Sequence, residues 1–105
     1  MLTRYDEFPV HQTPYPFSYS NITDYSFDDG YFFSVFNADL DLFLMTGMRV
    51  NANTDMVGAY AGVMFRGRQY TARFSREWRP VCDTHIGPLR YDFVTPFEDI
   101  HLTLT

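Results

Sequence analysis

After residue 30 the chain is divided into short apolar segments separated by turn-forming residues, and this spacing limits the fold more than any other feature. Six segments have the length of strands, and none shows the 3.6-residue repeat of an amphipathic helix. The predicted strands are residues 31–37, 41–50, 57–66, 69–76, 89–95 and 100–105. Their short, mostly antiparallel-compatible connections predict an all-β fold, an antiparallel meander of about six strands.

Both faces of several predicted strands are apolar, whereas a single-layer sheet has one polar face toward solvent. Eleven Phe and eight Tyr add to this apolar surface. We therefore expect the strands to curl into a lipocalin-like barrel or half-barrel around an aromatic interior. The apolar run 102–105 would leave an open strand edge. That edge predicts either a homo-oligomer or pairing with a missing second half of a longer chain.

Residues 1–30 are predicted to form an extended arm. Pro9, Pro14 and Pro16 exclude a helix and a central strand there. Phe8, Tyr15 and other rings are too numerous for a free tail, so the arm should pack on the surface of a single domain at residues 31–105.

The charge balance excludes several classes of partner. The formal net charge is −5 and the chain has eight basic residues, so no basic stripe for nucleic acid is present. No apolar run is long enough for an integral membrane segment. The single cysteine, Cys82, and the charged first residues without an apolar signal region predict a cytoplasmic protein without disulfides.

Motifs for metals, cofactors or nucleophilic catalysis are not recognisable in the sequence. Asp24, Asp28 and Asp29 precede a glycine, but their spacing does not match a calcium-binding loop. Cys82 and His85 form one C-x-x-H pair, whereas a zinc site needs three or four ligands. We therefore predict no metal and no cofactor.

Small residues surround Tyr60 in its predicted strand, and they leave room either for a ligand or for a neighbouring ring packed over glycine. Three arginines lie within predicted strands, where they either bind the carboxylate of a lipid-like ligand or face solvent. The predicted ligand-binding residues are Phe43, Tyr60, Phe74, Tyr91, Arg49, Arg73 and Arg90.

Several blocks of the sequence resemble one family. They are HQTPYPF at 11–17, YFFSVF at 31–36, DLFLMTGM at 41–48, GAYAGV at 58–63, RFSR at 73–76 and IGPLRY at 86–91. These blocks are similar to the N-terminal part of the bacterial AttH-like, lipocalin-type proteins related to carotenoid 1,2-hydratase. The resemblance implies two lipocalin-like halves, of which this chain would supply most of one.

The leading hypothesis is binding of a hydrophobic small molecule, a lipid or an isoprenoid, in an aromatic-lined interior. An alternative is a hydratase or isomerase acting on a polyene, with Asp92 as the candidate acid because it lies between Tyr91 and Phe93. A second alternative is a non-catalytic structural or interaction domain that pairs through open sheet edges.

Overall fold

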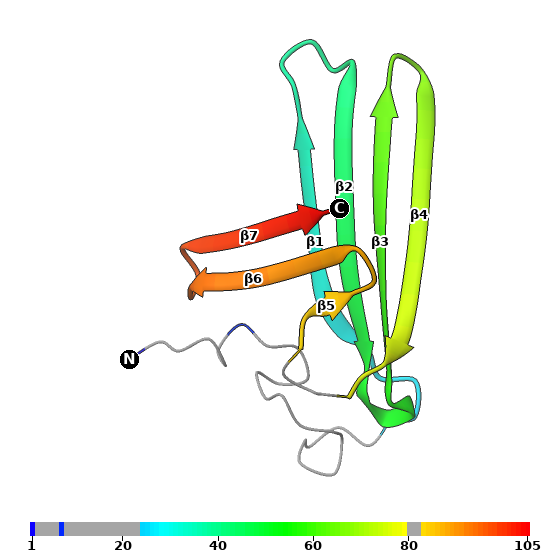
Figure 1. Cartoon of the computed structure of the whole chain (residues 1–105), viewed down its shortest axis with the longest axis vertical. Helices are drawn as coiled ribbons and strands as arrows, with labels where there is room; N and C mark the ends of the chain where they lie inside the picture. Colours follow the sequence, from blue (N-terminus) through cyan, green and yellow to red (C-terminus); the bar gives the residue numbers. More distant parts are fainter. Residues whose placement is uncertain (2–6, 8–23, 80–82) are drawn as a thin grey trace.

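The computed structural model describes Met1, Glu7 and residues 24–79 and 83–105, and in these residues the protein is all-β. All strand pairs are antiparallel and form two sheets. The larger sheet has the order β1-β2-β3-β4, and the smaller has the order β5-β6-β7 (Figure 1). The strands are β1 (Asp29–Phe36), β2 (Leu42–Asn51), β3 (Met56–Phe65), β4 (Arg68–Glu77), β5 (His85–Ile86), β6 (Leu89–Thr95) and β7 (Asp99–Leu104), with a 3₁₀ turn, η3 (Ala52–Thr54), after β2.

The six predicted strands are present, and their bounds agree with the prediction to within two residues. The prediction missed the short β5 and the η3 turn, which lie in segments predicted to be loops. Most of the predicted arm at residues 1–30 lies outside the described residues. Asp29 and Gly30, assigned to that arm, belong to β1 instead.

The predicted single meander is in fact two meanders. β4 and β5 follow each other in the chain but are not hydrogen-bonded neighbours, so the sheet is interrupted between them. β6 and β7 run across the strands of the larger sheet (Figure 1), as in orthogonally packed sheets. The described residues thus form two stacked sheets that are not closed into a barrel.

Arg76 holds the connection that leads from one sheet to the other. Its Nε donates to the His85 carbonyl at 2.8 Å, and its Nη1 donates to the Glu77 carbonyl at 2.6 Å. Its Nη2 also donates to the Asp83 carbonyl. One guanidinium therefore satisfies backbone acceptors on both sides of this connection, which fixes where the smaller sheet begins.

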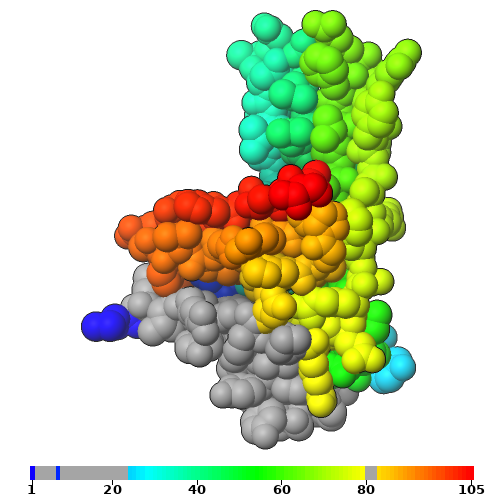
Figure 2. Space-filling view, in the orientation of Figure 1, coloured from blue at the N-terminus to red at the C-terminus, as the bar shows by residue number. Residues whose placement is uncertain are grey.

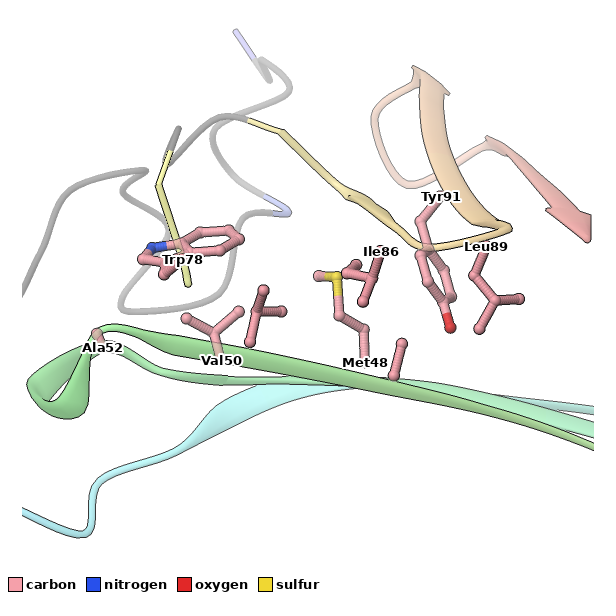
Figure 3. Close-up of a cluster of buried hydrophobic side chains, with 9 residues drawn as sticks. Met48, Val50, Ala52, Trp78, Ile86, Leu89 and Tyr91 are labelled. Atoms are coloured by element: carbon pink, nitrogen blue, oxygen red, sulfur yellow. The ribbon is translucent and has the colours of Figure 1, made fainter. Parts of the chain in front are cut away.

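The hydrophobic core lies between the two sheets. Met48 and Val50 of β2 point from the larger sheet toward the layer that holds Trp78, Ile86 and Tyr91 (Figure 3). Val57 of β3 belongs to the same buried cluster. We call this side of the larger sheet the inner face and the opposite side the outer face. Trp78, fully buried, closes the core next to the η3 turn.

The smaller sheet covers only part of the inner face. Beyond β7, the ends of the four long strands extend without a covering layer (Figure 2). Inner-face residues there are accordingly exposed, including Val35 at 61% and Tyr70 at 61%. Apolar surface of this kind in one contiguous region is typical of an interaction site.

Candidate functional site

An apolar groove of about 260 Å³ opens where the core ends, between the inner face and strands β6 and β7. Its walls come from both sheets. The lining residues are Phe33, Val35, Leu44, Met45, Thr46, Ala61, Gly62, Val63, Leu89, Arg90, Tyr91, Leu102, Thr103 and Leu104.

The alternation of side chains along each strand builds the groove. On β2, Leu44 and Thr46 share the inner face with Met48, which is part of the core. Ala61 lies opposite Thr46 in the register of β2 and β3, and its short side chain leaves space over the sheet. On β7, Leu102 faces the groove because it pairs with the inward-pointing Tyr91. The groove is therefore lined by the same inner-face positions that form the core, farther along the strands.

The polar groups at the floor of the groove are two hydroxyls. Thr46 Oγ1 lies 2.7 Å from Tyr91 Oη and 2.8 Å from the Tyr60 carbonyl oxygen. Tyr91 Oη also lies 3.1 Å from the Gly47 carbonyl oxygen. The two hydroxyl hydrogens can donate to only two of these three contacts. In the bond between the two hydroxyls, either Thr46 or Tyr91 can be the donor. Both hydroxyls thus have hydrogen-bond partners within the protein.

Burial raises the pKa of Tyr91 above its ordinary value, and the hydrogen bond with Thr46 opposes this rise. The hydroxyl therefore remains protonated at neutral pH and can act as a hydrogen-bond donor. It supplies no charge to the groove.

Two of the predicted ligand residues, Tyr91 and Arg90, line this groove. Arg90 Nη2 lies 3.5 Å from Asp92 Oδ2, so its guanidinium already has an anionic partner. Phe74 is on the inner face and packs against the core, and a Cβ built on Gly87 would lie 3.1 Å from its ring. Phe74 therefore contributes to packing between the sheets and does not line the groove.

Tyr60, Phe43, Arg49 and Arg73 lie on the outer face, because each alternates with inward-pointing neighbours. The Tyr60 ring lies over Gly47, where an added Cβ would be 2.7 Å from it. The Tyr60 ring thus packs over a glycine of the neighbouring strand, and the small residues beside Tyr60 do not mark a ligand site there. Arg49 Nη1 lies 3.6 Å from Asp28 Oδ2 in an exposed ion pair.

Phe43 borders a separate hollow of about 340 Å³ at the hairpin ends. Its other lining residues are Phe36, Leu40, Leu42 and Met64. The seven predicted residues therefore do not converge on one pocket.

Asp92 does not lie in the apolar environment that the enzyme hypothesis assumed. Its carboxylate lies 3.5 Å from His85 Nε2 as well as from Arg90, on the side of the smaller sheet away from the groove. Alternation along β6 explains this, because Tyr91 and Phe93 both point inward and Asp92 between them points outward. The geometry therefore places the candidate acid outside the groove.

His85 lies between Asp83 and Asp92, with Nδ1 3.4 Å from Asp83 Oδ1. The two carboxylates contact opposite ring nitrogens and do not converge on a common point. Among the described residues no group of three or more His, Cys, Asp or Glu side chains could hold a metal ion. Cys82 of the C-x-x-H pair lies outside the described residues.

Sequence reasoning missed Phe33, Leu44, Thr46 and Val63, which line the groove with Leu102. Their alternation places the first four on one face, but the other face is also apolar. The sequence therefore does not indicate which face meets the second sheet.

None of the helical turns in the described segments is long and apolar enough to cross a membrane. No curated protein and no solved structure matches the chain significantly. One family model matches residues 2–105, which is nearly the whole chain. The chain therefore belongs to this family of unknown function, DUF8625.

Proposed function

We propose that the protein binds a hydrophobic small molecule in the groove between its two sheets. The observation that carries the proposal is the composition of the groove, in which aliphatic and aromatic walls surround one hydroxyl pair. Ligand sites typically combine mostly apolar walls with a few well-placed polar groups. The two crossing sheets would act as the walls of a half-open, lipocalin-like cup.

The size of the groove limits the ligand. Its volume of about 260 Å³ is just below the ~300–1,000 Å³ of typical small-molecule sites. A single medium-length aliphatic chain or a small isoprenoid fits this space, whereas a full-length carotenoid does not. This favours the binding hypothesis over the polyene hydratase.

The polar groups indicate a neutral ligand. Arg90 is already paired with Asp92, so no unpaired cation among the groove-lining residues awaits a carboxylate. The Thr46 and Tyr91 hydroxyls can instead exchange hydrogen bonds with an alcohol or a carbonyl. We therefore expect a long-chain alcohol to bind more tightly than the corresponding carboxylate.

A displacement assay tests this proposal, with anilinonaphthalene sulfonate as the fluorescent probe and decanol or decanoate as competitor. Leu44→Trp would fill the groove from β2, and we expect it to weaken decanol binding at least tenfold, or about 1.4 kcal/mol. Met64→Trp is the matched control, because Met64 is similarly exposed but lies on the outer face (39% for Leu44, 43% for Met64).

If the unmodified protein does not bind decanol, the proposal is refuted. Equal loss of binding in both tryptophan variants would refute the assignment to this groove. Circular dichroism of each variant confirms that the sheets are intact.

A further inference from the structure

The last strand of the smaller sheet, β7, has only one neighbour, β6, and its other edge is open among the described residues. The Thr105 N–H donates to the Pro88 carbonyl at 3.2 Å, which shows that odd-numbered residues direct their backbone groups toward β6. The N–H of Tyr91 donates away from β7, to Thr84, in agreement with this alternation. The backbone groups of Ile100, Leu102 and Leu104 therefore point out of the sheet edge.

This edge carries few of the features with which proteins usually block strand pairing, namely the charge of Asp99 at its start and an irregular register with β6 at Phe93 to Thr95. It has no Lys, no Pro and no charged side chain on its inward face. Its inward residues include Leu102, 41% exposed, and Leu104, 55% exposed. An open, apolar edge of this kind is a template for another strand.

Among the described residues, the larger sheet has two further edge strands, β4 and β1. β4 carries four charged residues along its length, Arg68, Arg73, Arg76 and Glu77. β1 is also apolar, with Phe32, Val35 and Phe36 more than half exposed, and on it the N–H of Gly30 donates to the Asp29 carboxylate at 2.8 Å. Among the described residues, the edge of β7 is open and its inward face is apolar.

We propose that a second copy of this chain pairs with β7 through its own β7, in antiparallel orientation about a two-fold axis at Leu102. In this register Leu102 faces Leu102 of the second copy, and Ile100 faces Leu104. Both are hydrogen-bonded pairs, which use the backbone groups that point outward. The register pairs the whole segment from residue 99 to residue 105 and joins two three-stranded sheets into one of six strands.

The side chains of β7 are compatible with this register. On the outward face Asp99 lies opposite Thr105 and His101 opposite Thr103, so no like charges are opposed. On the inward face only Ile and Leu side chains meet. A two-fold axis at His101 would also pair five residues of β7 (99–103), but it would place His101 opposite His101 and Leu104 opposite Glu98.

The second copy would also cover surface that one chain leaves bare. β7 crosses the larger sheet at the boundary between its covered and uncovered parts (Figures 1 and 2). A second β7 beside it would lie over the exposed inner face near Val35 and Leu44 and lengthen the groove. The pairing itself does not depend on a ligand, so it can be tested separately from the proposed function.

Light scattering after size exclusion tests the pairing without any ligand. We expect the mass to rise to twice that of the monomer as the concentration is increased to about 100 μM. Leu102→Pro removes an outward N–H but no bond to β6, and proline is tolerated on edge strands. It should raise the dimer dissociation constant at least tenfold more than Leu102→Ala, which shortens the same side chain but keeps the N–H.

A monomer throughout this concentration range overturns the proposal. So does a dimer that Leu102→Pro weakens no more than Leu102→Ala. Should Leu102→Pro fail to fold, hydrogen exchange of the unmodified protein decides. The amides of Ile100, Leu102 and Leu104 should lose protection on dilution, and protection independent of dilution contradicts the pairing.

Discussion

Two tyrosines on facing elements, Tyr31 of β1 and Tyr91 of β6, differ in what their hydroxyl groups contact. Tyr91 shares hydrogen bonds with Thr46 and the Gly47 carbonyl, whereas the buried Tyr31 hydroxyl has no hydrogen-bond partner within the described residues. Burial raises the pKa of Tyr31, and the negative charges of Glu7 and Asp29 raise it further. Its ring nevertheless packs against Phe93 with centroids 5.0 Å apart. The ring of Tyr31 therefore stabilises the fold, and its hydroxyl does not.

Removing each hydroxyl should have opposite effects on stability. Tyr91→Phe leaves Thr46 or a backbone carbonyl without its partner, so we expect the free energy of unfolding to fall by about 1–2 kcal/mol. Tyr31→Phe removes a buried hydroxyl that makes no hydrogen bond to any residue the structure describes, so stability should be unchanged or rise by up to about 1 kcal/mol. Urea denaturation followed by circular dichroism measures both. A loss in Tyr31→Phe as large as that in Tyr91→Phe would contradict this account.

At the scale of single elements, the positions of the strands were predictable, but the face of each strand that packs against the second sheet was not. Residues 89–95 were placed correctly because turn formers bound an apolar run on both sides. The two-residue β5 carries too little pattern to be recognised, since its pairing depends on Arg76 fixing the preceding connection. Tyr60 was predicted to bind a ligand because small residues surround it, but these residues lie on both faces of β3, and the sequence does not rank one face above the other.

The turn between β3 and β4 is determined by the backbone conformation of its two central residues. Arg66 and Gly67 both have positive φ, 49° and 77°, as two-residue hairpin turns require.

Gly67→Ala should therefore lower the free energy of unfolding by roughly 1 kcal/mol. A Cβ there would have no atom within 4 Å, so the cost comes from the backbone alone. Gly58→Ala within β3 is the control, since its Cβ would make only ordinary contact, 3.7 Å from the Phe74 carbonyl oxygen. We expect that variant to be unchanged or slightly more stable. Equal urea midpoints for Gly67→Ala and the unmodified protein would show that the turn is not strained.

At the scale of the whole molecule, the interruption of the sheet after β4 creates the groove. A continuous meander of the same strands would have placed residues 89–104 beside β4, in one layer. Instead the chain crosses over the inner face, buries Met48 and Val57, and stops covering the sheet near Leu44. The sequence predicted an all-β fold with an apolar interior, but this crossing depends on long-range packing that periodicity does not encode.

The central claim is that a hydrophobic molecule occupies the space between the two sheets. Methyl-labelled nuclear magnetic resonance during a decanol titration tests it most directly. We predict saturable shifts at the methyl groups of Val35, Leu44, Val63, Leu102 and Leu104, which line the groove. Absence of shifts, or shifts confined to Leu40 and Leu42 at the hairpin ends, would contradict the account.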